Sequence, residues 1–139
     1  MQKKIIIYSI AVILLFVGCG RIKYRSYRKK AAQGKVVLNR EWSEENIYRI
    51  TVVGRWNRQK YSYNQDDEKE YKPPQILRAD ASRAAELNAF HNLRRELSER
   101  NVELNNTAGI NQSIVSKYYT EEHDTIITYR IVINTNYFK

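Results

Sequence analysis

Residues 77–100 have the sequence LRADASRAAELNAFHNLRRELSER, and this stretch decides the fold of the chain. It is rich in Ala, Leu, Glu and Arg and contains no Gly, Pro or β-branched residue, so its helix propensity is high throughout. On a helical wheel its large apolar side chains fall within about 120° of one another. These side chains are Leu87, Phe90, Leu93 and Leu97, with Ala79 beside them. We therefore expect one long helix that packs on a core through this stripe.

The same helix has a second flank made of small residues, which would let another element approach closely. This flank consists of Ala81, Ala84, Ala85 and Ala89. The pair Pro73-Pro74 precedes the helix and is expected to stop it from extending backwards.

Alternating apolar and polar residues predict strands on both sides of the helix. In residues 47–54 (IYRITVVG), Tyr48, Ile50 and Val52 share one face, which indicates a half-buried strand that ends at Gly54. Residues 36–38 (VVL) predict a short edge strand. After the helix, residues 114–120 and 125–134 predict two further strands, joined by a polar hairpin loop at residues 121–124.

These elements predict an α+β fold: a small antiparallel sheet of three to five strands with one long helix packed on one face, in two layers. We expect the strands to follow one another as a meander. Residues 55–75 are polar and tyrosine-rich and predict a long exposed loop between strand and helix.

The N-terminus has the pattern of a secretion signal. Lys3 and Lys4 precede an apolar run at residues 5–17, which is shorter than the roughly 20 residues of a membrane-spanning helix. The run ends in LFVGC at residues 15–19, which resembles a lipobox with Phe16 in place of the usual Leu. The resemblance implies a bacterial lipoprotein whose Cys19 is acylated and becomes the new N-terminus. The alternative is an uncleaved membrane anchor.

We therefore expect three parts: a signal peptide at residues 1–18, an acylated tether at 19–34 and a single domain at 35–139. The tether contains the basic stretch RIKYRSYRKK at residues 21–30, which either contacts anionic lipid headgroups or serves as a solvated spacer. In some bacteria an Asp after the cysteine retains a lipoprotein at the inner membrane, so Gly20 favours the outer membrane.

The helix also carries a family resemblance. Residues 78–97 (RADASRAAELNAFHNLRREL), together with Val52-Val53-Gly54 before them, resemble the small twenty-kilodalton lipoprotein family. Its members share a lipobox, an apolar strand ending in Gly and an Ala-rich helix, and some are lipoproteins of the flagellar basal disk. Here the segment after the helix is shorter than usual, and the loop before it is unusually acidic and tyrosine-rich.

Composition restricts the chemistry of the mature protein. The single cysteine excludes an internal disulfide and a Cys-rich metal site, and its acylation would leave no thiol for catalysis. The two histidines, His91 and His123, lie on different elements, and no hydrolase triad, zinc motif or phosphate loop is present. His123 lies among acidic residues that could bind a divalent cation weakly, but a solvated turn is the better interpretation. We expect no enzyme activity, no cofactor and no metal.

Two hypotheses for function follow. The first is a non-catalytic envelope lipoprotein, bound to membrane lipid through Cys19, whose domain self-associates or docks on an envelope assembly through a strand edge or the small-residue helix flank. The second is a module that binds an anionic envelope ligand, such as peptidoglycan or lipopolysaccharide. The net charge of +9 falls to about +7 without the signal lysines and favours anionic partners, although an exported protein rarely meets nucleic acid. The candidate ligand surface consists of Arg55, Trp56, Arg58, Lys60 and Tyr61.

Overall fold

The computed structural model describes residues 23–102, 109–134 and 136. The chain divides into two units, Met1–Gly34 and Lys35–Lys139. In the first unit, residues 23–32 of the segment assigned to the tether are helical. The predicted signal peptide and Cys19 lie outside the described residues.

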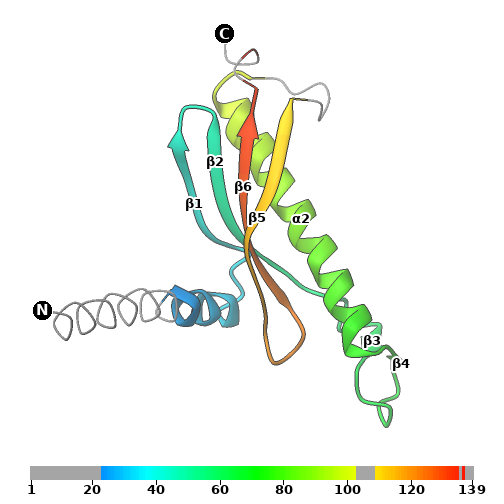
Figure 1. Ribbon diagram of the computed structural model, residues 1–139. Coiled ribbons are helices and arrows are strands. Elements are labelled where there is room, and N and C mark those ends of the chain that lie inside the picture. The colour runs from blue at the N-terminus through cyan, green and yellow to red at the C-terminus, as the bar shows by residue number, and fades with distance from the viewer. Residues whose placement is uncertain (1–22, 103–108, 135, 137–139) are drawn as a thin grey trace, which may run out of the picture. The chain divides into compact units, whose positions relative to one another are not determined.

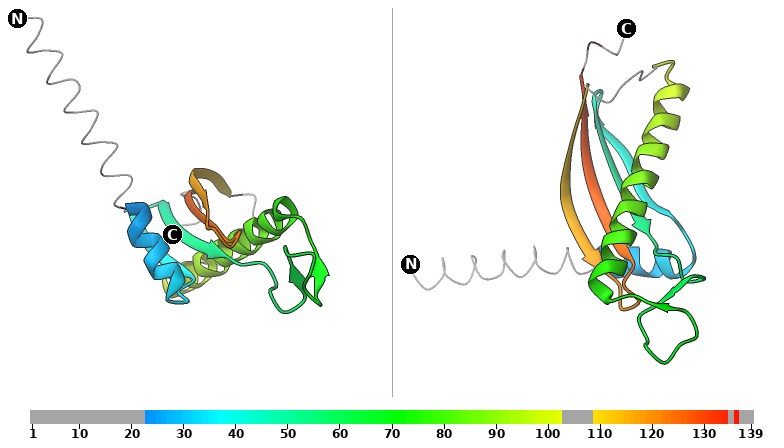
Figure 2. Two further views of the ribbon diagram at one scale, coloured as in Figure 1. Left: turned by 90° about the horizontal axis from the view of Figure 1, so that it is seen from below. Right: turned by 90° about the vertical axis from the view of Figure 1, so that its right-hand side faces the viewer.

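The second unit has two layers, a four-stranded antiparallel sheet and one long helix (Figure 1). The sheet consists of β1 (Val37–Glu44), β2 (Ile47–Gly54), β5 (Ile110–Tyr119) and β6 (Thr125–Ile133). The helix is α2 (Pro74–Glu99), and the side view in Figure 2 shows it lying along one face of the sheet. The predicted α+β class, with one helix on one face of the sheet, is confirmed.

The expected meander is wrong, because the strand order is β1-β2-β6-β5. Strand β6, the last in the chain, pairs with β2 and separates it from β5. The apolar content of the two strands explains this order. Strand β6 has buried isoleucines on both of its faces: Ile126, Ile127 and Ile131. In β5 the first residue, Ile110, is followed by three polar residues, Asn111, Gln112 and Ser113. The more apolar strand occupies the centre and the polar one the edge.

Strand β2 has the predicted bounds but is not half-buried. Tyr48, Ile50 and Val52 face the helix as expected, yet Thr51 and Val53 on the opposite face are each only 1% exposed. Strand β2 is therefore buried on both faces. The buried hydroxyl groups of Thr51 and Thr128 share a hydrogen bond of 2.8 Å, so neither loses its partner on burial.

Helix α2 begins three residues earlier than predicted, at Pro74. Proline fits the first position of a helix because the amide it lacks would have no intrahelical partner there. After Glu99 the chain turns through Asn101, whose φ of 58° lies in the left-handed region that Asn tolerates.

The predicted core-facing stripe of α2 is partly wrong. Leu87 is 70% exposed, Ala79 is exposed and Phe90 is only partly buried. The side of the helix that is buried includes most of the small-residue flank; its members are Leu77, Ala81, Ala85, Ala89, Asn92, Leu93 and Leu97.

The close approach of strand β2 to α2 explains this choice of face. A Cβ atom added to Gly54 would overlap the carbonyl oxygen of Ala81 and would lie 2.5 Å from the amide nitrogen of Ala85. Only a face of alanines lets the two backbones come this close. Asn88 strengthens the contact, because its side-chain amide donates a 3.0 Å hydrogen bond to the carbonyl of Val53.

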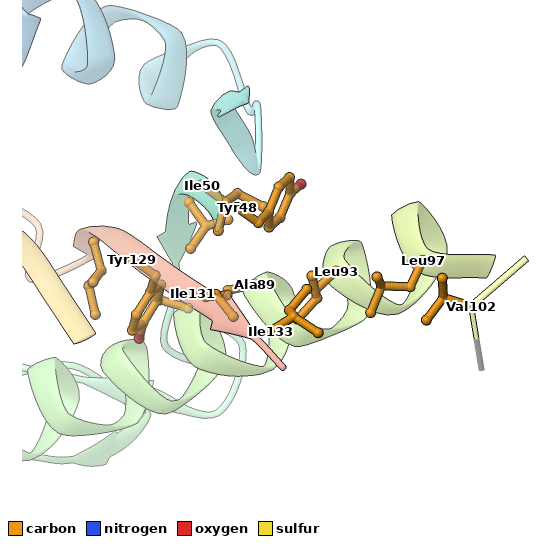
Figure 3. Close-up of a cluster of buried hydrophobic side chains, with 12 residues drawn as sticks. Tyr48, Ile50, Ala89, Leu93, Leu97, Val102, Tyr129, Ile131 and Ile133 are labelled. Atoms are coloured by element: carbon orange, nitrogen blue, oxygen red, sulfur yellow. The ribbon is translucent and has the colours of Figure 1, made fainter. Parts of the chain in front are cut away.

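The main core lies between α2 and the two inner strands (Figure 3). Four side chains that alternate along β6 are all buried in it: Ile127, Tyr129, Ile131 and Ile133. The hydroxyl group of Tyr48 is also buried and has no hydrogen-bond partner among the described residues. Burial, together with the charge of Glu96, raises the pKa of Tyr48 to about 12.

Candidate functional site

The segment between β2 and α2 is fixed to the hairpin that joins β5 and β6. It contains two short strands that pair with each other, β3 (Tyr61–Ser62) and β4 (Glu70–Tyr71). Trp56 is only 7% exposed and packs on Leu77 and Ala81 of the helix. Its indole Nε1 donates a 2.8 Å hydrogen bond to the carbonyl of Glu122 in the hairpin.

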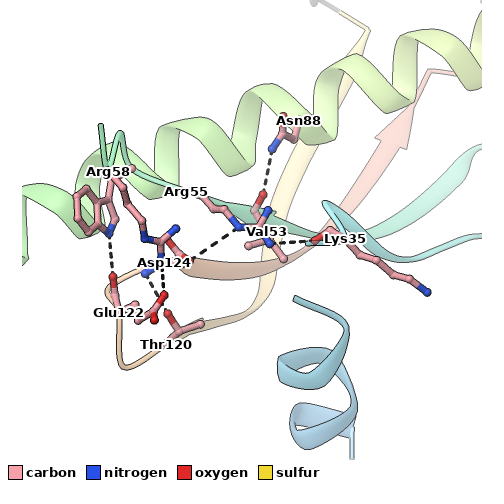
Figure 4. A network of polar contacts seen from close by, with 9 residues as sticks. Lys35, Val53, Arg55, Arg58, Asn88, Thr120, Glu122 and Asp124 are labelled. Carbon is pink, nitrogen blue, oxygen red and sulfur yellow. Dashed lines mark hydrogen bonds and ion pairs between the residues drawn. The ribbon is translucent and has the colours of Figure 1, made fainter. Parts of the chain in front are cut away.

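The arginines of this segment bind the carboxylates of the same hairpin (Figure 4). One guanidinium nitrogen of Arg58 lies 2.7 Å from Asp124 Oδ2 and 2.8 Å from Glu122 Oε2. Arg55 Nε lies 3.9 Å from the same oxygen of Asp124. The Asp124 side chain is 9% exposed, so this network is half-buried and joins segments far apart in the sequence.

This geometry reduces the number of side chains in the predicted ligand surface that are available to bind a ligand. The structure brings Arg55, Trp56 and Arg58 together, but Trp56 is buried and Arg58 is already bound to two carboxylates. The three residues hold the segment in place. Whether the surface binds a ligand stays a prediction.

Lys60 and Tyr61, the other two residues of the predicted surface, form a more accessible group. Lys60 Nζ lies 5.1 Å from the centre of the Tyr61 ring, and Lys72 Nζ lies 3.6 Å from it. Hydrogen bonding to the Lys60 and Lys72 ammonium groups lowers the pKa of Tyr61. Lys72 also forms a 3.2 Å ion pair with Asp80, so it is partly neutralised.

His123 occupies the turn of the hairpin with a φ of 66°. Arg78 Nε donates a 3.3 Å hydrogen bond to His123 Nδ1, and the Tyr63 ring contacts the imidazole edge-to-face at 4.9 Å. Burial and the Arg78 charge lower the pKa of His123. Within the described residues no three His, Cys, Asp or Glu side chains lie close enough to hold a metal ion. His91 is exposed.

The outer edge of β5 is one of the two edges of the sheet. The strand has ten residues and pairs with β6 on one side only among the described residues. Ile114 and Val115 are 55% and 52% exposed. At the opposite edge β1 carries three charged residues, Arg40, Glu41 and Glu44, whereas β5 carries only Lys117.

Comparison of the chain with protein-family models, curated proteins and solved structures gives no match. The resemblance to the twenty-kilodalton lipoprotein family therefore stays a prediction, as does acylation of Cys19. None of the helices in the described part of the chain has the length and apolar character needed to cross a membrane.

Sequence analysis did not single out Asp124, Arg49 or Arg130. Asp124 was placed in a solvated loop because the arginines that bind it are distant in the sequence. Arg49 and Arg130 each lie within a strand, β2 and β6, that is recognised in the sequence by its apolar residues. The signal that was missing is strand order, because only the pairing of β2 with β6 makes these two arginines neighbours.

Proposed function

We propose that this chain is a membrane-anchored bacterial envelope lipoprotein whose non-catalytic α+β domain associates with a second copy of itself through β5. Anchoring rests on the lipobox pattern that ends at Cys19. Self-association rests on one observation, the long β5 edge with exposed apolar side chains.

An unpaired strand edge presents a row of backbone N–H and C=O groups that another strand can complete. Proteins normally protect such edges with charged residues, proline or bulges. Strand β1 is protected by Arg40, Glu41 and Glu44. Strand β5 has one lysine and one irregularity, between Ile114 and Ser116, so it is the less protected edge.

The charge pattern of β5 favours a second copy as its partner. Antiparallel pairing of two β5 strands about a two-fold axis near Ile114 and Val115 places Lys117 opposite the uncharged Asn111-Gln112 segment of the partner. No like charges meet, and the exposed Ile114 and Val115 side chains of both copies gather at the axis. The pairing would join the two sheets into one.

Sedimentation of the full-length protein in a non-ionic detergent tests this proposal. Val115→Lys adds a charge to the exposed β5 edge, and Asn39→Lys adds the same charge to the opposite edge at β1. We expect a dimer for the wild type and for Asn39→Lys, but a monomer for Val115→Lys. Circular dichroism checks that both variants remain folded.

A wild-type protein that is monomeric at all accessible concentrations would contradict self-association. A dimer that Val115→Lys leaves intact would exclude β5 as the interface. Docking of β5 on a different envelope protein would appear as a monomer that binds that protein only with Val115 intact.

The second hypothesis, a module for an anionic envelope ligand such as peptidoglycan or lipopolysaccharide, has less support at the predicted surface. Two of its cationic side chains, Arg55 and Arg58, already face Asp124. The accessible positive charges there belong to Lys60 and Lys72 beside Tyr61.

A further inference from the structure

Two arginines lie next to each other on the face of the sheet opposite α2. Arg49 of β2 and Arg130 of β6 are direct partners in the antiparallel pairing. Their chain neighbours Tyr48, Ile50, Tyr129 and Ile131 point into the core, so both arginine side chains start from the outer face. Directly opposite residues on one face have Cβ atoms about 5 Å apart.

This arrangement is unfavourable for the protein alone. Like charges placed directly opposite each other destabilise a sheet. Both arginines are only partly exposed, and Arg49 Nε is buried with no hydrogen-bond acceptor in the part of the chain that the structure describes. A buried N–H group with no acceptor costs free energy, and proteins rarely leave one unpaired without a reason.

No carboxylate of the described residues compensates these two charges. Arg40 and Arg58 have carboxylate oxygens at 3.0 and 2.7 Å, whereas Arg49 and Arg130 form no ion pair with any described residue. Glu41 of β1 is the pairing partner of Arg49 on its other side, but its exposed side chain forms no ion pair with Arg49. The positive charges of Arg49 and Arg130 are therefore available to bind an anion.

Buried residues flank the two arginines along the strands. On one side lie Thr51 and Thr128, which are buried and bonded to each other. On the other side lie Ile47, which is buried, and Val132. An ionic contact made between these two pairs of residues is screened less by water than one on an open surface.

We propose that Arg49 and Arg130 together bind a phosphate group. Two guanidinium groups supply two positive charges and several N–H donors in fixed planes, which match the charge and the oxygen atoms of a phosphomonoester. The group could be free phosphate or the phosphate of an ester such as a lipid headgroup. The site is independent of self-association through β5, because it uses the face of the inner strands.

Titration calorimetry of the full-length protein in non-ionic detergent at low ionic strength tests the site with inorganic phosphate, with sodium chloride as the blank. Arg49→Gln and Arg130→Gln each remove one charge from the site, and Arg94→Gln removes the same charge from an exposed position on α2. We expect saturable binding to the wild type, weakened about tenfold or more by each site variant. Arg94→Gln is expected to bind like the wild type.

Thermal unfolding without phosphate separates binding from folding. If the arginines repel each other, Arg130→Gln should unfold at the same temperature as the wild type or higher, and a given phosphate concentration should raise that temperature less for Arg130→Gln than for the wild type and Arg94→Gln. A lower unfolding temperature for Arg130→Gln without phosphate would indicate a structural role and overturn the proposal, as would equal phosphate binding by all variants.

Glycerol phosphate identifies the source of the phosphate. Binding of glycerol phosphate as tightly as inorganic phosphate, with the same dependence on Arg49 and Arg130, supports an ester such as a lipid headgroup. Binding of inorganic phosphate alone supports the free ion. If neither compound binds, the proposal is wrong.

Discussion

At Gly54, strand β2 lies against the backbone of helix α2. A side chain there would overlap Ala81 and crowd Ala85, and both contacts are with helix backbone, which cannot move aside like the end of a flexible side chain. The absence of a Cβ atom at Gly54 therefore permits this close approach of strand and helix.

Gly54→Ala is expected to lower the free energy of unfolding by about 3 kcal/mol, because the helix must shift to admit the methyl group. Urea unfolding followed by circular dichroism measures this change. Ala79→Ser, at an exposed position of the same helix, is the control and should cost less than about 1 kcal/mol. If Gly54→Ala is as stable as the control, the close approach is not a feature of the protein.

His123 makes the stability of the hairpin depend on pH. Its Nδ1 accepts a hydrogen bond from Arg78, and burial with the Arg78 charge lowers its pKa below 6.5. As the pH falls through 6.5, the unfolded chain binds a proton that the folded protein does not. The contribution of His123 to stability is therefore complete above pH 6.5 and is lost as the pH falls toward the folded pKa.

His123→Asn removes the titration but keeps a residue that tolerates the left-handed backbone. Unfolding free energies measured between about pH 7.5 and about pH 5.5 should fall more for the wild type than for this variant. Parallel pH profiles of the two proteins would show that His123 does not titrate differently on folding.

At the scale of the elements, helix α2 presents a face of small residues to the sheet. Leu93 is fully buried in the main core, whereas Leu87 lies less than two turns earlier and is 70% exposed. The two leucines therefore allow the same substitution to be compared in one helix.

Leu93→Ala is expected to cost about 3 kcal/mol of unfolding free energy through the cavity it leaves. Leu87→Ala should change stability by less than about 0.5 kcal/mol, because it removes no buried contact. Chemical denaturation of both variants tests the orientation of the helix. Equal losses would mean that the stripe expected from the large apolar residues faces the core after all.

The elements were predictable where periodicity was strong. The alternation in β2 and β6 and the uninterrupted propensity of α2 identified all three within a few residues. The helix face was not predictable from the large residues, because close packing against Gly54 selects the alanines. The strand order was not predictable either. It depends on which strand of the β5–β6 hairpin, β5 or β6, pairs with β2 and is buried at the centre of the sheet.

The candidate site was less predictable than the fold. Sequence proximity grouped Arg55, Trp56 and Arg58 correctly, but it could not show that Asp124 and Glu122 bind these arginines from a distant hairpin. In the same way, Arg49 and Arg130 are unremarkable in sequence and become neighbours only through the register of β2 and β6.

At the scale of the whole molecule, the proposed anchor rests on the sulfur atom of Cys19. Acyl chains contribute about 0.8 kcal/mol per buried methylene, and two or more chains are needed for a stable anchor. The positive charge of the chain would add attraction to anionic lipids.

Mass spectrometry of the purified wild type should show a chain that begins at Cys19 and carries acyl groups. Cys19→Ser should lack the acyl mass and leave the membrane pellet for the soluble fraction, whereas Gly20→Ser, beside it, should stay in the pellet. A full-length wild-type chain with an unmodified thiol would remove the basis for a lipoprotein.

The position of β6 between β2 and β5 also has a consequence for synthesis. A growing polypeptide makes the β1-β2 hairpin first and the strand that completes its inner edge last. Until β6 emerges, β2 and α2 lack the surface on which their apolar sides close, so the nascent chain cannot collapse early into its final form. If the chain is exported as proposed, this late completion of the core would favour its passage through the export channel, because no compact fold would have to be unfolded first.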